Sequence, residues 1–209
     1  MAKISKMSTK EKILQTTEIL FAENGYDGTK VDEIANKAGV NKALIYYYYN
    51  NKYGLLKELV IRHVQEAVEF KETLLEEVQE YTDDEVRMIF RKIFSFLEQK
   101  SEILSILTIE TLKSGSKDKN IFYLLHPIYE RTLSDLTERG YQIDDFTEQI
   151  IYMFFYGTIP ATIFISLNDK WSEFYESDPQ YTKELFQRQM EDFYVNFYRE
   201  ITGRKIGTY

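Results

Sequence analysis

The chain has 209 residues, a formal net charge of −8 and no cysteine. Hydrophobic residues make up 44% of it and charged residues 29%, which is typical of a globular protein and excludes a disordered or fibrous chain. Without cysteine there is no disulfide, and no apolar leader opens the sequence, so we expect a cytoplasmic protein. The length allows one or two domains, each with a core of its own.

The first two predicted helices lie near the start of the chain, at residues 9–24 and 29–38. Thr29 and Asp32 have the spacing of a capping box at the start of the second helix. Apolar residues of the second helix recur three, four and seven positions apart, as on one buried face. Gly39 is then expected to adopt the left-handed conformation that ends this helix.

A third helix is predicted at residues 42–49, with Asn41 as its N-cap. Ile45 and Tyr49 lie four positions apart, so both can face the second helix and be buried. The residues left facing outward are Lys42, Ala43, Tyr46 and Tyr47. Two short helices joined by a tight turn that contains glycine are the pattern of a helix-turn-helix.

The outward face of the third helix is unusual for a surface in water, because it carries consecutive tyrosines beside a lysine. Such residues suit a helix in the major groove of DNA, where phenolic hydroxyls reach phosphate oxygens and rings pack on thymine methyl groups. Residues 34–57 also hold four lysines and no acidic residue. The alternative interpretation is a packed helical hairpin with an ordinary aromatic core.

The rest of the sequence predicts helices and contains no strand candidate, which gives an all-α fold of about nine helices. The predicted ranges are 54–79, 83 onward, 101–113, 120–138, 144 onward and 179–203. We expect two domains, at residues 1–53 and 54–209.

Residues 1–60 carry nine basic and seven acidic side chains, whereas residues 61–209 carry seventeen basic and twenty-seven acidic side chains. This asymmetry fits a nucleic-acid-binding end on an acidic body.

Residues 150–167 form an uncharged, apolar stretch that is long enough to raise the question of a membrane span. A helix that is apolar all round can equally be a core helix, buried on one side by its own domain and on the other by a partner. Because this is the one such stretch and it continues into polar residues, we expect no membrane insertion.

Sequence motifs for catalysis and cofactor binding are missing. We find no glycine-rich phosphate loop, no Gly-x-Ser-x-Gly elbow and no dinucleotide fingerprint. The two histidines, His63 and His126, lie on different predicted helices, without cysteine nearby. We therefore predict no enzyme activity, no metal site and no cofactor. His63 is expected at the surface, and His126 is expected in a core or, second, in a pocket.

The predicted second domain has features of a small-molecule pocket. Glu110 falls on the apolar face of its helix, where a carboxylate is costly unless it is paired or reaches water. Pro127 and Pro160 lie inside predicted helices and interrupt their hydrogen bonding. An apolar site with a few polar tips suits a lipophilic ligand, and the candidate residues are Phe94, Leu107, Glu110, Tyr123, His126, Tyr129, Tyr152 and Tyr156. The alternative is an ordinary core in which Glu110 forms a salt bridge.

The charge of such a ligand depends on Glu110. A buried carboxylate favours a lipophilic cation. A neutral or anionic lipid-like ligand is the alternative, with Glu110 then at the rim or paired to an arginine such as Arg91 or Arg131.

Residues of the first sixty positions together resemble the N-terminal domain of the TetR family of transcriptional regulators. The resemblance rests on Gly25-Tyr26-Asp27-Gly28-Thr29, Ile34-Ala35, Ala38-Gly39-Val40, Ile45-Tyr46-Tyr47-Tyr48-Tyr49 and Asn51-Lys52. The sequence departs from the family at Tyr48, where histidine is usual, at Tyr49, Leu44 and Tyr53-Gly54. The remainder resembles the family in length and helical character.

The resemblance implies a homodimeric regulator, a repressor, that binds a near-palindromic DNA operator and is released by a small lipophilic ligand. Thr29 and Lys30 would hold phosphate. Lys42, Ala43 and Tyr47 would face base edges, and Tyr46, Tyr48 and Lys52 would contact the DNA backbone. The dimer would form through helices near residues 145–167 and 180–202, where the apolar residues are Met153, Phe154, Ile163, Phe186, Met190 and Phe193. The alternative is a helical small-molecule carrier or interaction protein without DNA binding.

Overall fold

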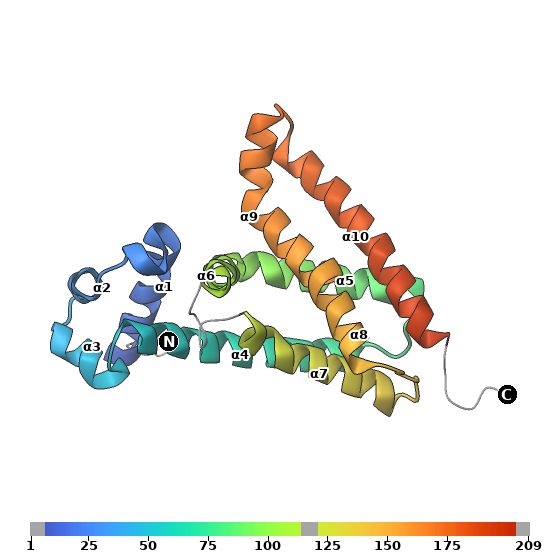
Figure 1. Ribbon diagram of the computed structural model, residues 1–209, viewed down its shortest axis with the longest axis horizontal. Coiled ribbons are helices and arrows are strands. Elements are labelled where there is room, and N and C mark those ends of the chain that lie inside the picture. The colour runs from blue at the N-terminus through green and yellow to red at the C-terminus, as the bar shows by residue number, and fades with distance from the viewer. Residues whose placement is uncertain (1–6, 114–120, 204–209) are drawn as a thin grey trace, which may run out of the picture. The chain divides into compact units, whose positions relative to one another are not determined.

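The computed structural model describes residues 7–113 and 121–203. Within these ranges every regular element is a helix (Figure 1), which confirms the predicted all-α fold. With α8, η1 and α9 taken as one continuous helix, the described ranges hold nine helices, as the sequence predicts.

The chain divides into two compact units. The first unit comprises residues 1–65 and 106–124, and the second comprises residues 66–105 and 125–209. Helices α4, α6 and α7 contribute residues to both units. This division by contacts does not follow the single boundary after residue 53 that the sequence suggests, and that boundary stays a prediction.

Local sequence signals place the first three helices. α1 (Thr9–Gly28) begins at the Ser8–Glu11 capping box, and its helical conformation is interrupted at Gly25, where φ is 72°. α2 (Val31–Ala38) ends at Gly39, whose φ of 64° and ψ of 41° are left-handed, as predicted. α3 (Lys42–Tyr49) begins at Asn41, whose side chain accepts a hydrogen bond from the Ala43 N–H.

The following helices are longer and have apolar stripes at helical spacing. They are α4 (Lys52–Glu77), α5 (Asp83–Gln99), α6 (Ser101–Leu112) and α7 (Phe122–Glu138). Thr82 and Glu85 form a capping box at the start of α5. Asn120, where the sequence predicts the start of α7, lies outside the described residues.

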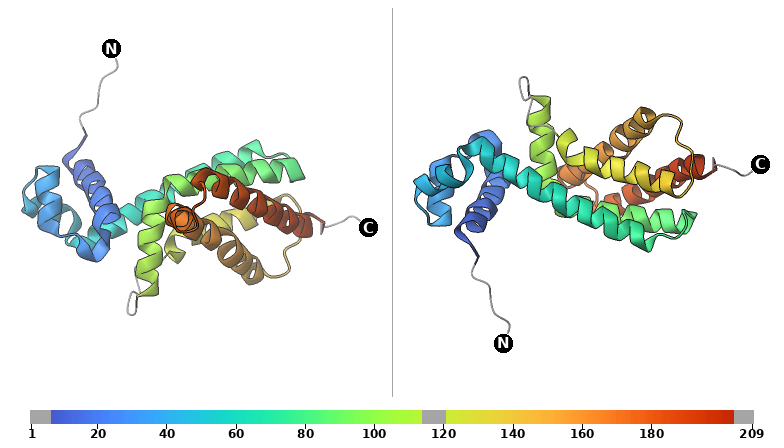
Figure 2. Two further views of the ribbon diagram at one scale, coloured as in Figure 1. Left: turned by 90° about the horizontal axis from the view of Figure 1, so that it is seen from above. Right: turned by 90° about the horizontal axis from the view of Figure 1, so that it is seen from below.

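The apolar stretch at residues 150–167 lies in a helix that changes its winding. α8 (Phe146–Ile151) continues into the π-helical segment η1 (Tyr152–Thr158) and then into α9 (Ile159–Phe174). Pro160, the second residue of α9, has no N–H for the carbonyl one turn before it, which accounts for the wider winding at this place. α10 (Pro179–Thr202), capped by Asp178, packs beside α5 and α9 (Figure 2).

In the described part of the chain, a membrane-spanning length and composition occur in one helix, Phe146–Phe174, with a mean hydropathy of 1.8. Only 28% of its apolar window is buried within the chain. The exposed apolar side chains of such a helix are expected to be buried against another molecule, and a protein partner can bury them as well as lipid can.

Candidate nucleic-acid interface

Helix α3 is held in the first unit by two residues of its inner face. Ile45 is fully buried and Tyr49 is 5% exposed. The Tyr49 hydroxyl donates a hydrogen bond of 2.8 Å to the carbonyl oxygen of Lys10, across 39 residues of sequence. Burial raises the pKa of Tyr49 to about 12, so this hydroxyl stays protonated and keeps donating. The predicted inner face of α3 is therefore confirmed.

The outer face of α3 presents aromatic rings to solvent. Tyr47 is 79% exposed, and Tyr46 and Tyr48 are exposed beside it. Tyr47 and Tyr48 meet edge to face, with 5.1 Å between ring centroids. Ala43 is also exposed. Three exposed phenol rings on an eight-residue helix leave apolar surface in contact with water, which is unfavourable.

Lys42 stands at the start of this outer face and is linked to α2. Its ammonium donates to the Asp32 carboxylate at 2.8 Å and lies 5.7 Å from the centre of the Tyr46 ring. The Asp32 hydrogen bond raises the pKa of Lys42 above its usual value. Since the pair is exposed to solvent, the lysine can exchange Asp32 for a phosphate or a base edge at little cost.

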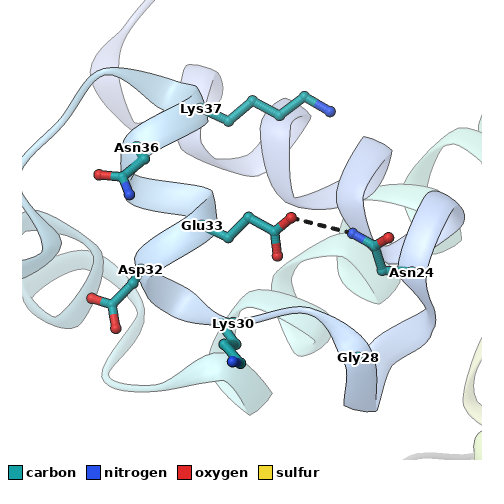
Figure 3. A pocket seen from close by; sticks show the side chains of 7 residues that line it. All are labelled: Asn24, Gly28, Lys30, Asp32, Glu33, Asn36 and Lys37. Carbon is teal, nitrogen blue, oxygen red and sulfur yellow. Dashed lines mark hydrogen bonds between the residues drawn. The ribbon is translucent and has the colours of Figure 1, made fainter.

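A shallow hollow lies next to this surface, between the end of α1 and α2 (Figure 3). It is lined by Asn24, Gly28, Lys30, Asp32, Glu33, Asn36 and Lys37. The Asn24 amide donates to Glu33 across it. Lys37 forms an ion pair with Glu23, and most of the lining is polar, so we assign no small-molecule site to the hollow.

The capping role predicted for Thr29 is wrong. Lys30 is the N-cap of α2 and makes no side-chain cap hydrogen bond. Thr29 is 1% exposed, and its hydroxyl lies 2.9 Å from the carbonyl oxygens of both Leu20 and Gly25. The hydroxyl therefore ties the residue before α2 to the place where α1 is interrupted at Gly25. Lys30, next to it, is exposed.

Lys52 also faces the protein. Its ammonium donates to the carbonyl oxygens of Tyr26 at 2.8 Å and of Thr29 at 3.1 Å, and it lies 4.5 Å from the centre of the Tyr26 ring. A third carbonyl, that of Asp27, is 3.4 Å away. These contacts join the first turn of α4 to the connection between α1 and α2, and they occupy the donors that a DNA phosphate would need.

Gly54 is required by the corner between α3 and α4, a signal that sequence analysis missed. A Cβ atom at this position would lie 1.8 Å from the carbonyl oxygen of Tyr49. The Gly54 N–H donates to the side chain of Asn51 at 2.9 Å. The departure from the family pattern at Tyr53-Gly54 therefore has a structural reason, because the backbone of α4 passes directly against the end of α3.

The predicted ligand residues are divided between the two units. Leu107, Glu110 and Tyr123 belong to the first unit, whereas the others belong to the second. Phe94, Leu107, Glu110 and Tyr129 are buried, but Tyr123, His126 and Tyr156 are exposed. Tyr129 donates to the Thr158 hydroxyl at 2.7 Å. Tyr152 stacks between Phe193 and Phe197. A single pocket that holds all eight stays a prediction.

Glu110 is paired, which agrees with the salt-bridge alternative. Its carboxylate, 3% exposed, accepts a hydrogen bond from Lys113, and Lys113 also contacts Asp27 at 2.6 Å. The arginines considered as its partners are engaged elsewhere: Arg91 with Glu191 and Arg131 with Glu138. Within the first unit, the ion pairs of Lys113 with Glu110 and Asp27 thus link the end of α6 to the end of α1.

The expected burial of the two histidines is wrong, whereas the pocket role considered for His126 stays a prediction. His63 is 4% exposed, and its Nε2 lies 2.7 Å from the Glu18 carboxylate, because α4 packs its first half on α1. His126 has an exposed side chain, 3.3 Å from Glu130 one turn along α7. In the described residues no group of three or more His, Cys, Asp or Glu side chains could hold a metal ion.

A helix-turn-helix whose second helix displays basic and aromatic side chains defines a DNA-binding regulator. Residues 13–59 match the family described as bacterial regulatory proteins, tetR family. The probable HTH-type transcriptional regulator YttP of Bacillus subtilis is 28% identical over 94% of this chain and 91% of its own length. These matches support a regulator of the TetR family, whose family model covers the helix-turn-helix region of this chain.

Solved structures of this fold agree. A putative TetR-family transcriptional regulator from Mesorhizobium loti superimposes with a TM-score of 0.64, at 20% identity, covering 94% of this chain and 98% of that one. The transcriptional regulator FadR from Bacillus subtilis, in complex with stearoyl-CoA, gives a TM-score of 0.63 at 21% identity, covering 88% and 96%. At these identities the likeness shows the fold alone.

Proposed function

We propose that this chain is a cytoplasmic repressor that binds a near-palindromic operator as a homodimer and leaves it when a small lipophilic ligand binds. The observation that carries the proposal is the outer face of α3, where three exposed tyrosines follow Lys42 on a helix anchored by Ile45 and Tyr49. Tyr47 and Ala43 would meet base edges, and Tyr46, Tyr48 and Lys30 would meet phosphates.

The dimer is supported by an exposed apolar stripe on the helix Phe146–Phe174. Phe155, Ile163, Leu167 and Trp171 recur at multiples of four residues and are 42–59% exposed. An apolar stripe of this length is a typical interface core. Of the six interface residues that the sequence suggests, Ile163 is exposed, Met153, Phe186 and Phe193 are half-buried, and Phe154 and Met190 are buried. The interface would thus lie mainly on α9.

A ligand acts on DNA binding by preferring one arrangement of the protein over another. Helix α4 is the element best suited to transmit this preference, because residues 52–65 belong to the first unit and residues 66–77 to the second without a break in the helix. The FadR structure, in complex with stearoyl-CoA, supports a lipophilic ligand, since it shows that this fold accommodates one.

The test is a gel-shift and footprinting experiment on the DNA that flanks the gene. We expect a protected near-palindrome with half-sites about 34–36 Å apart, or a multiple of one helical turn. Lys42→Ala should cost about 1–3 kcal/mol of binding free energy and relax specificity at one position. Lys92→Ala is the matched control, because Lys92 is an ion-paired surface lysine of the second unit and its loss changes the net charge equally. Parent-like DNA binding by Lys42→Ala would refute the interface, and absence of DNA binding would favour a carrier.

A further inference from the structure

The two neighbouring acidic residues of α2, Asp32 and Glu33, contact different helices. Glu33 reaches toward α1, where its carboxylate accepts a hydrogen bond from the Asn24 amide. Asp32 projects from the other side of α2 (Figure 3), and its carboxylate accepts a hydrogen bond of 2.8 Å from the ammonium of Lys42, the first residue of α3. An acidic side chain of α2 thus contacts the outer face of α3.

The contact with Asp32 restricts the position of the Lys42 ammonium. A lysine has a flexible four-carbon stem, so without partners its ammonium samples many positions. Here the ammonium is bound to the carboxylate and also lies 5.7 Å from the centre of the Tyr46 ring, one turn along α3. The carboxylate and the ring together hold the ammonium at the start of the outer face of α3.

A lysine on a DNA-binding surface can serve either of two roles. Bound to a phosphate it adds affinity for every sequence, whereas bound to the O6 and N7 atoms of guanine it reads one base pair. An ammonium has three donors, so Lys42 can contact an acceptor on DNA while it keeps Asp32. The Asp32 carboxylate disfavours the first role, because it repels an approaching phosphate and already supplies the opposite charge. A neutral base edge meets no such repulsion.

We propose that Asp32 is a positioning residue that directs Lys42 to a guanine edge and away from phosphates, and so determines specificity at one operator base pair. This inference rests on the proposed function for DNA binding. It adds a role for an acidic residue outside α3. It also predicts that the loss of this acidic side chain strengthens binding to unrelated DNA and weakens the recognition of the operator.

The experiment measures binding by fluorescence anisotropy to three kinds of duplex. They are the footprinted operator, operators with one base pair substituted at a time, and an unrelated duplex of equal length. For the parent, substitution of the base pair that Lys42 reads should weaken binding about tenfold. Lys42→Met identifies this base pair, because there the penalty should fall to about twofold or less.

Asp32→Asn keeps the size of the side chain and removes its charge. It should lower the penalty at the same base pair to about threefold or less, because Lys42 is then free to contact phosphates. Binding to the unrelated duplex should become several-fold tighter, and the slope of its salt dependence should steepen by about one unit per protomer.

Glu33→Gln is the matched control, because it removes the same charge from the next residue of α2, whose contact is with Asn24. It should keep the parent's penalty at that base pair, and any gain in affinity should be equal for all duplexes. A double-mutant cycle assigns the effect to Lys42. In the Lys42→Met background, Asp32→Asn should change neither the penalty nor the salt slope any further.

Three results would overturn the inference while the regulator stands. In the first, Asp32→Asn keeps the penalty and raises the affinity for all duplexes equally, as Glu33→Gln does, so the carboxylate acts through its charge alone. In the second, the effect of Asp32→Asn persists in Lys42→Met. In the third, Lys42→Met binds the operator more weakly but keeps every base-pair penalty of the parent. A folded parent without any sequence preference would instead overturn the proposed function and this inference together.

Discussion

At the scale of single residues, the charge of Lys71 links stability to pH. The pKa of Lys71 is about 8 in the folded protein, below its ordinary value of 10.5. Between these values the unfolded chain binds the proton and the folded chain does not, so the free energy of unfolding rises with pH. Below about pH 8 both states are protonated, and the full cost of the buried charge, roughly 3 kcal/mol as an upper figure, is present.

Lys71→Met should therefore be more stable than the parent at pH 7, and the gain should shrink as the pH rises from 8 toward 10.5. The measurement is urea unfolding of both proteins at pH 7 and pH 9.5. Lys92→Met should show no comparable gain. If Lys71→Met is less stable than the parent at pH 7, the ammonium contributes favourable contacts and is not an unmatched charge.

Lys52 gives a second prediction at this scale. Because its ammonium donates to the carbonyl oxygens of Tyr26 and Thr29, Lys52→Met should lower the free energy of unfolding by about 1–3 kcal/mol. The salt dependence of operator binding should keep its slope. The opposite result, unchanged stability with a slope flattened by about one unit, would identify Lys52 as a phosphate contact.

At the scale of elements, the corner between α3 and α4 positions the recognition surface. The Cβ atom of Gly54→Ala would lie 1.8 Å from a backbone carbonyl, so one of the two helices has to move. We expect a loss of about 1–3 kcal/mol in stability and a fall in DNA affinity, measured by thermal unfolding and gel shift. Gly28→Ala is the control, since its Cβ would meet the Asn24 side chain at an ordinary 3.6 Å. Parent-like DNA binding by Gly54→Ala would mean that the corner adapts without cost to the interface.

At the scale of the whole molecule, the exposed stripe of α9 predicts the oligomeric state. Leu167→Glu places a charge in the proposed dimer core and should yield monomers at micromolar concentration in sedimentation velocity, with operator affinity reduced accordingly. Ile61→Glu makes the same chemical change at a similarly exposed position of α4 and should remain dimeric. A Leu167→Glu variant that sediments like the parent dimer would move the interface elsewhere.

Much of the fold and of the α3 surface is determined by the sequence alone, because its signals act over a few residues. Ser8, Gly39, Asn41 and Asp145 cap or end helices through bonds to neighbours within four positions. Helical periodicity likewise separates the buried Ile45 and Tyr49 from the exposed Tyr46 and Tyr47. The helix-turn-helix and its outer face follow from these local rules.

Only the tertiary structure decides which polar side chains are buried and what they contact. The Thr29 hydroxyl donates a hydrogen bond to α1, and the Lys52 ammonium donates to carbonyl oxygens 23–26 residues away. The His63 ring is hydrogen-bonded to Glu18 across 45 residues. From the sequence, Lys71 is an ordinary lysine of an amphipathic helix. The carboxylate of Asp135 on α7 is already hydrogen-bonded to Arg139 and Tyr81, so Lys71 forms no ion pair with it. The free energy of a buried charge depends on partners distant in the sequence, and a periodic pattern carries no information about them.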